Sequence, residues 1–422
     1  ASNMQPIKME SFMTKKPWER RLKDLSHLLK CCIDTYFDPE LFRLNLNQFL
    51  QTARTVTFII QKNKNQIIGY DIWYNNNVIE KWKNDPLMAW AKNSRNTIEK
   101  QGDLEMYSEA KATLISSYIE ENDIEFITNE SMLNIGIKKL VRLAQKKLPS
   151  YLTESSIIKS ERRWVANTLK DYELLHALAI IYGRMYNCCN SLGIQINNPM
   201  GDDVISPTSF DSLFDEARRI TYLKLKDYSI SKLSFSMIQY DNKIIPEDIK
   251  ERLKLVDKPK NITSTEELVD YTAKLAETTF LKDGYHIQKL IFYDKQFHRI
   301  DLINTTFEDQ ADKYIFWRYA ADRAKITNAY GFIWISELWL RKASIYSNKP
   351  IHTMPIIDER LQVIGIDSNN NQKCISWKIV RENEEKKPTL EISTADSKHD
   401  EKPYFMRSVL KAIGGDVNTM NN

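Results

Sequence analysis

The chain has 422 residues, which exceeds the size at which one hydrophobic core usually stops growing, so two or three structural units are expected. Hydrophobic residues make up 42% and charged residues 27%, and a net charge of +4 is too small to predict nucleic-acid binding by the chain as a whole. Glycine is scarce, at 11 residues, and neither a GxGxxG nor a GxxxxGK[ST] motif occurs, which argues against the common phosphate-binding loops.

The cysteines and histidines predict no metal site and no cofactor. The five cysteines have neither CxxC spacing nor the pattern of a disulfide framework, as expected for reduced thiols in a cytosolic protein: Cys31, Cys32, Cys188, Cys189 and Cys374. No two of the six histidines are three or four residues apart. No stretch approaches the ~18 apolar residues of a membrane span. We therefore expect a cytoplasmic protein without membrane contact.

Two strong helix starts stand near the N-terminus. Residues 1–37 predict a leader with one amphipathic helix, and Asp38-Pro39-Glu40 then combines a capping carboxylate with a proline at the first helical position. Apolar residues follow at three- and four-residue steps to residue 60. Asp85-Pro86 starts another helix, which Gly102 ends.

Further helices are expected over residues 68–82 and 105–121, and a long apolar pattern runs over residues 160–193. Four helices with short polar connections predict an N-terminal up-and-down bundle, which with its extension occupies residues 38–200. Residues 201–264 form a connecting region.

Residues 265–422 predict a small α/β (or α+β) domain, so the fold class is mainly α with this C-terminal unit. Helices are expected near residues 264–281 and 314–324. Runs rich in Ile, Val, Phe and Trp predict strands over residues 287–293, 299–303, 331–339, 361–367 and 375–380. Ser368-Asn369-Asn370-Asn371 predicts a hairpin turn between the last two.

Residues 40–120 resemble the HEPN superfamily, whose members are helical bundles, often dimeric, and in many cases RNases or toxins of bacterial conflict and phage-defence systems. The resemblance rests on the helix over residues 46–60 and on the segment Arg95-Asn96-Thr97-Ile98-Glu99-Lys100. Active members have Arg, usually a polar residue such as Asn, and then His a few positions on. The resemblance implies a metal-independent endoribonuclease with Arg95, Asn96 and Lys100 as catalytic residues, and Lys100 stands where the histidine is expected.

That departure affects the chemistry. Arg is always charged and its fork matches phosphate oxygens, whereas His exchanges protons because its unperturbed pKa is ~6.5. A lysine, with an unperturbed pKa of ~10.4, is a poor proton shuttle although it binds phosphate. The segment therefore predicts either a surface arginine in a polar network at the helix end or an atypical HEPN site that binds RNA or mediates dimerisation, and it predicts an active RNase less strongly.

Two other clusters of charged residues are candidate functional sites. Residues 138–163 are strongly basic, which predicts either a nucleic-acid backbone contact or a solvated helix face: Lys138, Lys139, Arg142, Lys146, Lys147, Arg162 and Arg163. In the C-terminal domain, Glu337 lies within an apolar run and could form a metal site with Asp358 or Glu359. The alternative for Glu337 is a buried ion pair with Arg341, Arg360 or Arg381.

These observations support two hypotheses about function. The first is an RNA-associated HEPN-like protein of a bacterial conflict, phage-defence or stress system, a homodimer through its bundle, with weak or absent RNase activity. The alternative is a non-enzymatic dimeric interaction or scaffold protein, with Trp73, Trp82 and Trp90 as anchors.

Overall fold

The structure is a computed structural model, which describes residues 16–127, 141–142, 145–146, 150–214, 219–233, 236–237, 247–257, 259–342, 353–382, 386–392 and 403–418. The chain divides into two compact units. The first comprises Ala1–Thr113, Glu125–Lys146 and Lys159–Tyr222, and the second comprises Leu114–Ile124, Lys147–Ile158 and Leu223–Asn422. The chain therefore passes between the units five times.

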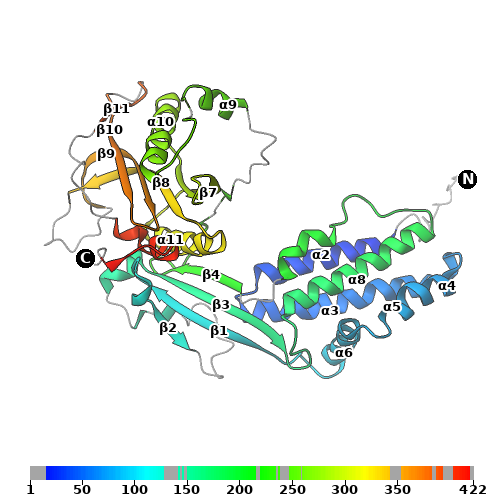
Figure 1. Cartoon of the computed structure of the whole chain (residues 1–422). Coiled ribbons are helices and arrows are strands. Elements are labelled where there is room, and N and C mark those ends of the chain that lie inside the picture. Colours follow the sequence, from blue (N-terminus) through cyan, green and yellow to red (C-terminus); the bar gives the residue numbers. More distant parts are fainter. Residues whose placement is uncertain are drawn as a thin grey trace, which may run out of the picture. The chain divides into compact units, whose positions relative to one another are not determined.

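The first unit is built mainly of helices (Figure 1). They are α2 (Pro17–Asp34), α3 (Pro39–Lys62), α4 (Tyr70–Tyr74), α5 (Glu80–Trp82), α6 (Pro86–Lys100) and α8 (Leu174–Gln195), with short 3₁₀ turns at Lys64–Gln66 and Pro207–Phe214. A π-helical turn, η2 (Asn75–Ile79), joins α4 to α5. The Asp38 and Asp85 side chains cap α3 and α6 by accepting main-chain N–H bonds, which confirms both predicted helix starts.

The long helices α2, α3 and α8 lie alongside one another and share one core. Each buries one apolar stripe: Trp18, Leu22, Leu25 and Leu29 from α2, Phe42, Leu46, Phe49 and Val56 from α3, and Leu178, Ile181, Met185 and Leu192 from α8. Trp73 and Trp90 are each 5% exposed and belong to the same core, where their indole N–H groups donate to Ser191 and Thr168. Neither indole is accessible as an interface anchor.

A four-stranded sheet in the order β2-β1-β3-β4 replaces part of the expected bundle. Its strands are β1 (Met106–Ile115), β2 (Ile124–Ile127), β3 (Ile157–Ala166) and β4 (Arg219–Lys224). The helix expected over residues 105–121 is therefore mainly strand β1, and the pattern over residues 160–193 contains the end of β3 before α8 begins. Between β1 and β2 lies a 3₁₀ turn, Glu120–Asn122, and before β3 lies another, Ser150–Ser155.

The second sheet has seven strands in the order β11-β10-β9-β8-β6-β7-β5, and every neighbouring pair is antiparallel. The strands are β5 (Ser236–Met237), β6 (Gln288–Tyr293), β7 (Arg299–Thr305), β8 (Gly331–Arg341), β9 (Ile356–Asp367), β10 (Gln372–Val380) and β11 (Thr389–Ile392). The helices of this unit are α9 (Glu247–Lys254), α10 (Thr265–Asp283), α11 (Gln310–Ile326) and α12 (Arg407–Ala412), after a 3₁₀ turn at Tyr404–Met406. The five strands and two helices that the sequence predicts here are confirmed.

Two helices cover opposite faces of this sheet. Helix α10 packs Val269, Ala273 and Phe280 against the face that carries Ile333, Val363 and Trp377. On the other face, α11 packs Phe316 and Trp317 on Trp334, with ring centroids 5.3 and 5.1 Å apart. Alternate residues of β8 thus fill two separate cores, as a strand covered on both faces requires.

The expected fold class, mainly α with a small C-terminal α/β unit, is wrong. The chain is an α+β protein in which three strands of the first sheet come before the bundle helix α8, and that sheet begins at residue 106, inside the region assigned to helices. Of the helices in the described ranges, none has the length and apolar character that crossing a membrane requires.

Candidate functional site

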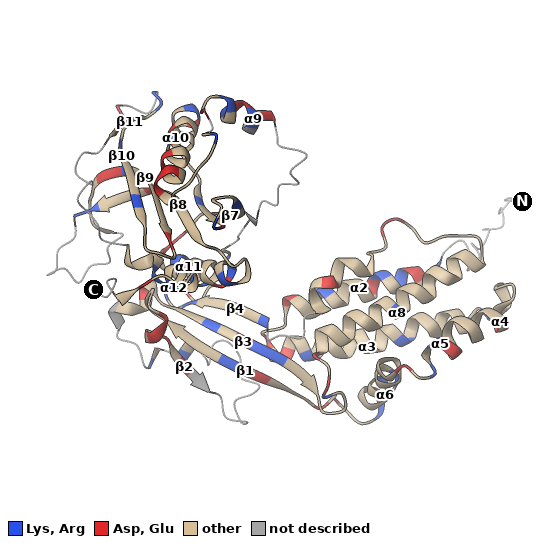
Figure 2. Ribbon diagram, in the orientation of Figure 1, with Lys and Arg blue, Asp and Glu red and all other residues tan. Residues whose placement is uncertain are grey.

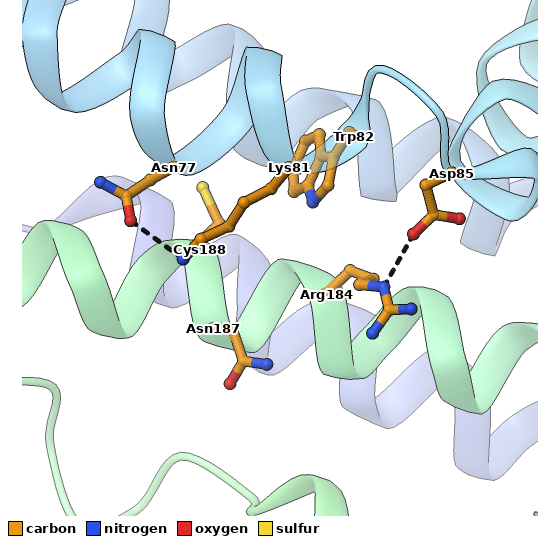
Figure 3. Close-up of a pocket in the computed structure, with 7 residues that line it drawn as sticks. All are labelled: Asn77, Lys81, Trp82, Asp85, Arg184, Asn187 and Cys188. Carbon is orange, nitrogen blue, oxygen red and sulfur yellow. Dashed lines mark hydrogen bonds and ion pairs between the residues drawn. The ribbon is translucent and has the colours of Figure 1, made fainter.

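In the first unit, a cavity of about 320 Å³ lies between the segment from η2 to the start of α6 and one face of α8 (Figure 3). It is lined by Asn77, Lys81, Trp82, Asp85, Arg184, Asn187 and Cys188. A second hollow of about 360 Å³ shares Lys81, Asp85 and Arg184 with it and extends past the start of α6. We refer to the first hollow as the η2–α8 cavity.

The π-helical turn explains how polar side chains come to face this cavity. Trp73 and Val78 are both buried and are five residues apart, which is the spacing that a π turn aligns. Next to them, Asn77 and Lys81 turn toward α8, and the Lys81 ammonium donates to Asn77 Oδ1 at 3.1 Å. The three consecutive asparagines at residues 75–77 favour a helix weakly, so core packing imposes this geometry.

The opposite wall comes from the middle of α8. Arg184, Asn187 and Cys188 are spaced by three and four residues and therefore share one face of the helix. Arg184 is the one Lys, Arg, Asp or Glu in this 22-residue helix. Cys188 adds no charge to this wall at neutral pH, because burial raises the pKa of its thiol to about 12, although the nearby Lys81 opposes that shift.

The charges around the cavity are unequal. Asp85 Oδ2 accepts a hydrogen bond from Arg184 Nε at 2.8 Å, while its other oxygen caps α6 by accepting from the main-chain N–H groups of Leu87 and Met88. Its carboxylate is thus fully engaged. Among the charged side chains that line the cavity, Lys81 and Arg184 are cations and Asp85 is the one anion, which leaves a surplus of positive charge.

The segment that resembles the HEPN motif lies at the end of α6. The Arg95 side chain is 31% exposed, and its guanidinium forms an ion pair with Glu99 at 2.7 Å and donates to Asn96 Oδ1 at 3.2 Å. Lys92 and Lys100 are exposed on the same helix. These five residues define the polar face of α6, which carries three cations and one carboxylate.

The basic stretch over residues 138–163 does not form one surface in the described part of the chain. Three of its cations lie outside the described residues: Lys138, Lys139 and Lys147. Arg142 and Lys146 are exposed, whereas Arg162 is fully buried on β3, with its guanidinium carbon 5.2 Å from the Trp164 ring centroid. Figure 2 shows bands of Lys and Arg along β3. Because strand side chains alternate, Arg163 points to the opposite face from Arg162 and is half-buried.

Arg162 is held inside the first unit by its surroundings. Its main-chain carbonyl oxygen and the carboxylate of Glu173 both accept from the Tyr36 hydroxyl, at 3.3 and 2.8 Å. Burial lowers the pKa of Arg162 to about 10, which still leaves it charged at neutral pH. A fully buried guanidinium cannot reach an RNA backbone, so Arg162 is removed from the candidate RNA contacts.

In the second unit, Glu337 on β8 does not approach Asp358. Its Oε1 accepts the main-chain N–H of His286 at 2.5 Å and its Oε2 lies 3.9 Å from the Arg381 guanidinium, so an ion pair with Arg381 is present, although it is partly exposed and not buried as predicted. Burial raises the pKa of the Glu337 carboxyl, and the bond from His286 and the charge of Arg381 oppose that shift. Asp358 is paired with Arg360 at 2.8 Å, which lowers the pKa of its carboxyl.

Glu359 shares Arg381 with Glu337. It accepts from Arg381 Nε at 2.7 Å and from the Trp339 indole N–H at 2.9 Å, and the pair with Arg381 lowers the pKa of its carboxyl. In the described ranges, no cluster of three or more His, Cys, Asp or Glu side chains is arranged to hold a metal ion. Glu337 and Glu359 thus share Arg381 as an ion-pair partner, whereas Asp358 pairs with Arg360.

Sequence reasoning missed the η2–α8 cavity. Its residues come from two segments about 100 positions apart, and neither carries a known motif. One signal was present, because a single arginine in the middle of an apolar helix such as α8 usually marks a partner or a site.

Comparison with known proteins identifies one matching family. No solved structure matches the chain. The family model described as bacteriophage lambda protein ea47 matches residues 14–201 and 211–406, which together make up most of the 422 residues. The chain therefore belongs to the family of bacteriophage lambda protein ea47.

Proposed function

We propose that this protein binds RNA through the polar face of α6 and cleaves it slowly or not at all. The resemblance to HEPN proteins supports an RNA partner, and it also supports a setting in a conflict, phage-defence or stress system. Binding would be electrostatic and independent of sequence, because the face offers charge and hydrogen-bond donors but no stacking aromatic.

The observation that carries the proposal is the composition of the polar face of α6. Lys92, Arg95 and Lys100 are at least partly accessible there, against Glu99 alone. The Glu99 carboxylate already orients the Arg95 guanidinium within the helix, so a phosphate would have to replace or share that partner. Glu99 therefore limits the affinity for RNA.

The same face explains why cleavage would be weak. It holds no imidazole, and the motif position expected to exchange protons is Lys100. Arg95 could stabilise the charge on a phosphorane, but no group of the polar face takes the proton from a 2′-hydroxyl near neutral pH.

The test is RNA affinity, measured by fluorescence anisotropy over a series of salt concentrations. Arg95→Ala should weaken binding and lower the slope of log affinity against log salt by about 1, as expected for one lost phosphate contact. Glu99→Gln should strengthen binding, because it releases Arg95. The matched control is Arg21→Ala, which removes an exposed arginine paired at i,i+3 with Asp24 in α2. Equal effects of Arg95→Ala and Arg21→Ala would refute the proposal.

Cleavage is tested separately by Lys100→His, which places a histidine where active HEPN proteins have one. If the polar face of α6 has the HEPN arrangement, this variant should cut single-stranded RNA in the presence of EDTA faster than the wild type does. A variant that binds RNA normally and gains no cleavage would retain the RNA proposal and remove the catalytic part of the resemblance.

A second candidate, self-association through the bundle, is supported by an exposed apolar surface. Ile68, Ile72 and Ile194 are 86%, 73% and 71% exposed. Gln195 Nε2 donates to the Ile68 carbonyl at 2.8 Å, so the ends of this surface are neighbours. Light scattering should show a dimer at micromolar concentration that Ile68→Asp with Ile72→Asp dissociates, while Leu44→Asp, an exposed residue of α3, does not.

A further inference from the structure

We infer that the η2–α8 cavity binds a phosphomonoester, the terminal phosphate group of a nucleotide or of an RNA 5′ end. This inference does not depend on the RNA contact proposed for the polar face of α6. The residues that line the cavity, their charges and their unused hydrogen-bond donors point to a small dianion with a flat group attached.

The cationic groups of the cavity have donors to spare. The Lys81 ammonium has three N–H groups, and Asn77 Oδ1 accepts one of them. Arg184 uses Nε for Asp85, and in the described part of the chain its two terminal nitrogens have no protein acceptor. A fork of this kind binds two oxygens of one phosphate, while an ammonium adds a point charge.

Asp85 prepares the site by fixing Arg184. Because its carboxylate caps α6 with one oxygen and accepts from Arg184 Nε with the other, the arginine is held at the rim with its terminal nitrogens directed away from Asp85 (Figure 3). The Arg184 side chain remains 48% exposed, whereas that of Asp85 is 10% exposed. The anion is thus shielded and the cation is presented to solvent.

The remaining lining fits an organic phosphate. Asn187 adds a carboxamide that can donate or accept, and the half-buried Trp82 ring gives a flat apolar wall against which a base can lie. The volume of about 320 Å³ lies at the lower end of the range for small-molecule sites, which suits a single nucleotide rather than a dinucleotide.

The experiment is calorimetric titration of the full chain with three probes: inorganic phosphate, adenosine 5′-monophosphate, and a short RNA with either a 5′-phosphate or a 5′-hydroxyl. We expect the monophosphate to bind, and Lys81→Gln to weaken it at least tenfold. Lys83→Gln is the matched control, since Lys83 is exposed two residues further on and does not line the cavity. It should change the affinity less than twofold.

Arg184→Gln should also weaken binding at least tenfold, but it leaves Asp85 without its partner, so the thermal unfolding of this variant is measured first. If the Arg184→Gln variant is unstable, the test rests on the affinities of the Lys81→Gln and Asn187→Ala variants for the monophosphate. A preference for 5′-phosphorylated over 5′-hydroxyl RNA that Lys81→Gln abolishes would identify the RNA end as the source of the phosphate. Absence of binding by every probe at 10 mM (about the weakest affinity of interest), or equal losses in Lys81→Gln and Lys83→Gln, would overturn the inference.

The outcome is separable from that of the RNA proposal. Arg95 and Glu99 are not part of the cavity lining, so Arg95→Ala should leave monophosphate binding unchanged. Conversely, Lys81→Gln should leave the binding of 5′-hydroxyl RNA unchanged.

Discussion

His286 lies between the end of α10 and the start of β6, with only 6% of its surface exposed. Burial, with help from the nearby Lys289, lowers the pKa of its imidazole from 6.5 to about 4. Its Nδ1 lies 2.7 Å from the Ile287 carbonyl oxygen, a contact that suits a neutral ring donating from that nitrogen. The folded state therefore keeps His286 neutral under conditions in which an unfolded chain would protonate it.

This makes the second unit sensitive to acid. Because the pKa is lower in the folded state, the unfolded state binds more protons between pH 6.5 and 4, and stability falls as the pH falls through that window. The loss attributable to His286 is at most about 3.5 kcal/mol, from ~1.4 kcal/mol per pKa unit. The raised pKa of Glu337 acts in the opposite direction, since that contribution is lost as the pH rises.

His286→Gln should therefore flatten the decline in stability between pH 7 and pH 4.5. The measurement is the urea dependence of hydrogen exchange in β6 and β8 at the two pH values. His298→Gln is the control, because that side chain is 78% exposed. A decline equally steep in His286→Gln and in the wild type would contradict the assignment.

At the scale of elements, strand β1 shows how tertiary contacts override local preference. Its sequence contains Met106, Glu109, Ala110, Lys111 and Ala112, all common in helices. It lies between β2 and β3 in the sheet, so both of its edges are hydrogen-bonded, and its last four residues are buried. Pairing on two sides stabilises an extended backbone that composition alone does not favour.

Ala110→Thr tests this assignment by the sign of its effect. In a strand the β-branched threonine should be neutral or stabilising by up to ~0.5 kcal/mol, whereas in a helix it would destabilise by a similar amount. The measurement is the midpoint of urea unfolding of the full chain. A clear destabilisation, with Ala89→Thr in helix α6 as the reference for a helical site, would argue for a helix.

The elements that the sequence does and does not predict differ in a physical way. Helices α3 and α6 are predictable because Asp-Pro starts act locally, and strands β8 and β9 are predictable because each contains an apolar run that is buried on both faces. Strand β3 is difficult to predict from the sequence, because its buried residues include Ser160 and Arg162 beside Trp164. The usual alternation of buried apolar and exposed polar residues is therefore absent.

The candidate sites differ in the same way. The Arg95 segment is contiguous in sequence, so it could be found as a motif. The η2–α8 cavity depends on a π-helical turn and on a helix about 100 residues later. Apart from Arg184, no local sequence feature predicts the turn or its packing against α8.

For the whole molecule, the second unit needs a segment from the first half of the chain. Tyr118 packs edge-to-face on Tyr314 and Tyr404, with ring centroids 4.8 and 5.3 Å apart. Its hydroxyl also accepts from Gln310 at 2.6 Å. Glu121 pairs with Arg407 and Lys411, both at 2.9 Å. No local sequence signal marks this short segment as part of the later unit.

Separating the chain at residue 222 should therefore fail to give a stable second unit. A fragment of residues 223–422 lacks Tyr118, and losing a buried aromatic side chain alone costs ~3–5 kcal/mol. We expect that fragment to unfold at lower urea than the same unit in the full chain, and co-expression with residues 1–222 to restore it. Proteolysis and amide exchange provide the measurement. A fragment as stable as the unit in the full chain would contradict this expectation.

The contact between Glu121 and Lys411 spans 290 residues. At the ~5–20 residues per second of protein synthesis, roughly 15 to 60 seconds pass on the ribosome between the appearance of these two partners. Until then the segment around Tyr118 lacks its contacts with Tyr404 and with helix α12. We expect chains that end before α12 to lack these contacts and to be cut by proteases more readily than the full chain.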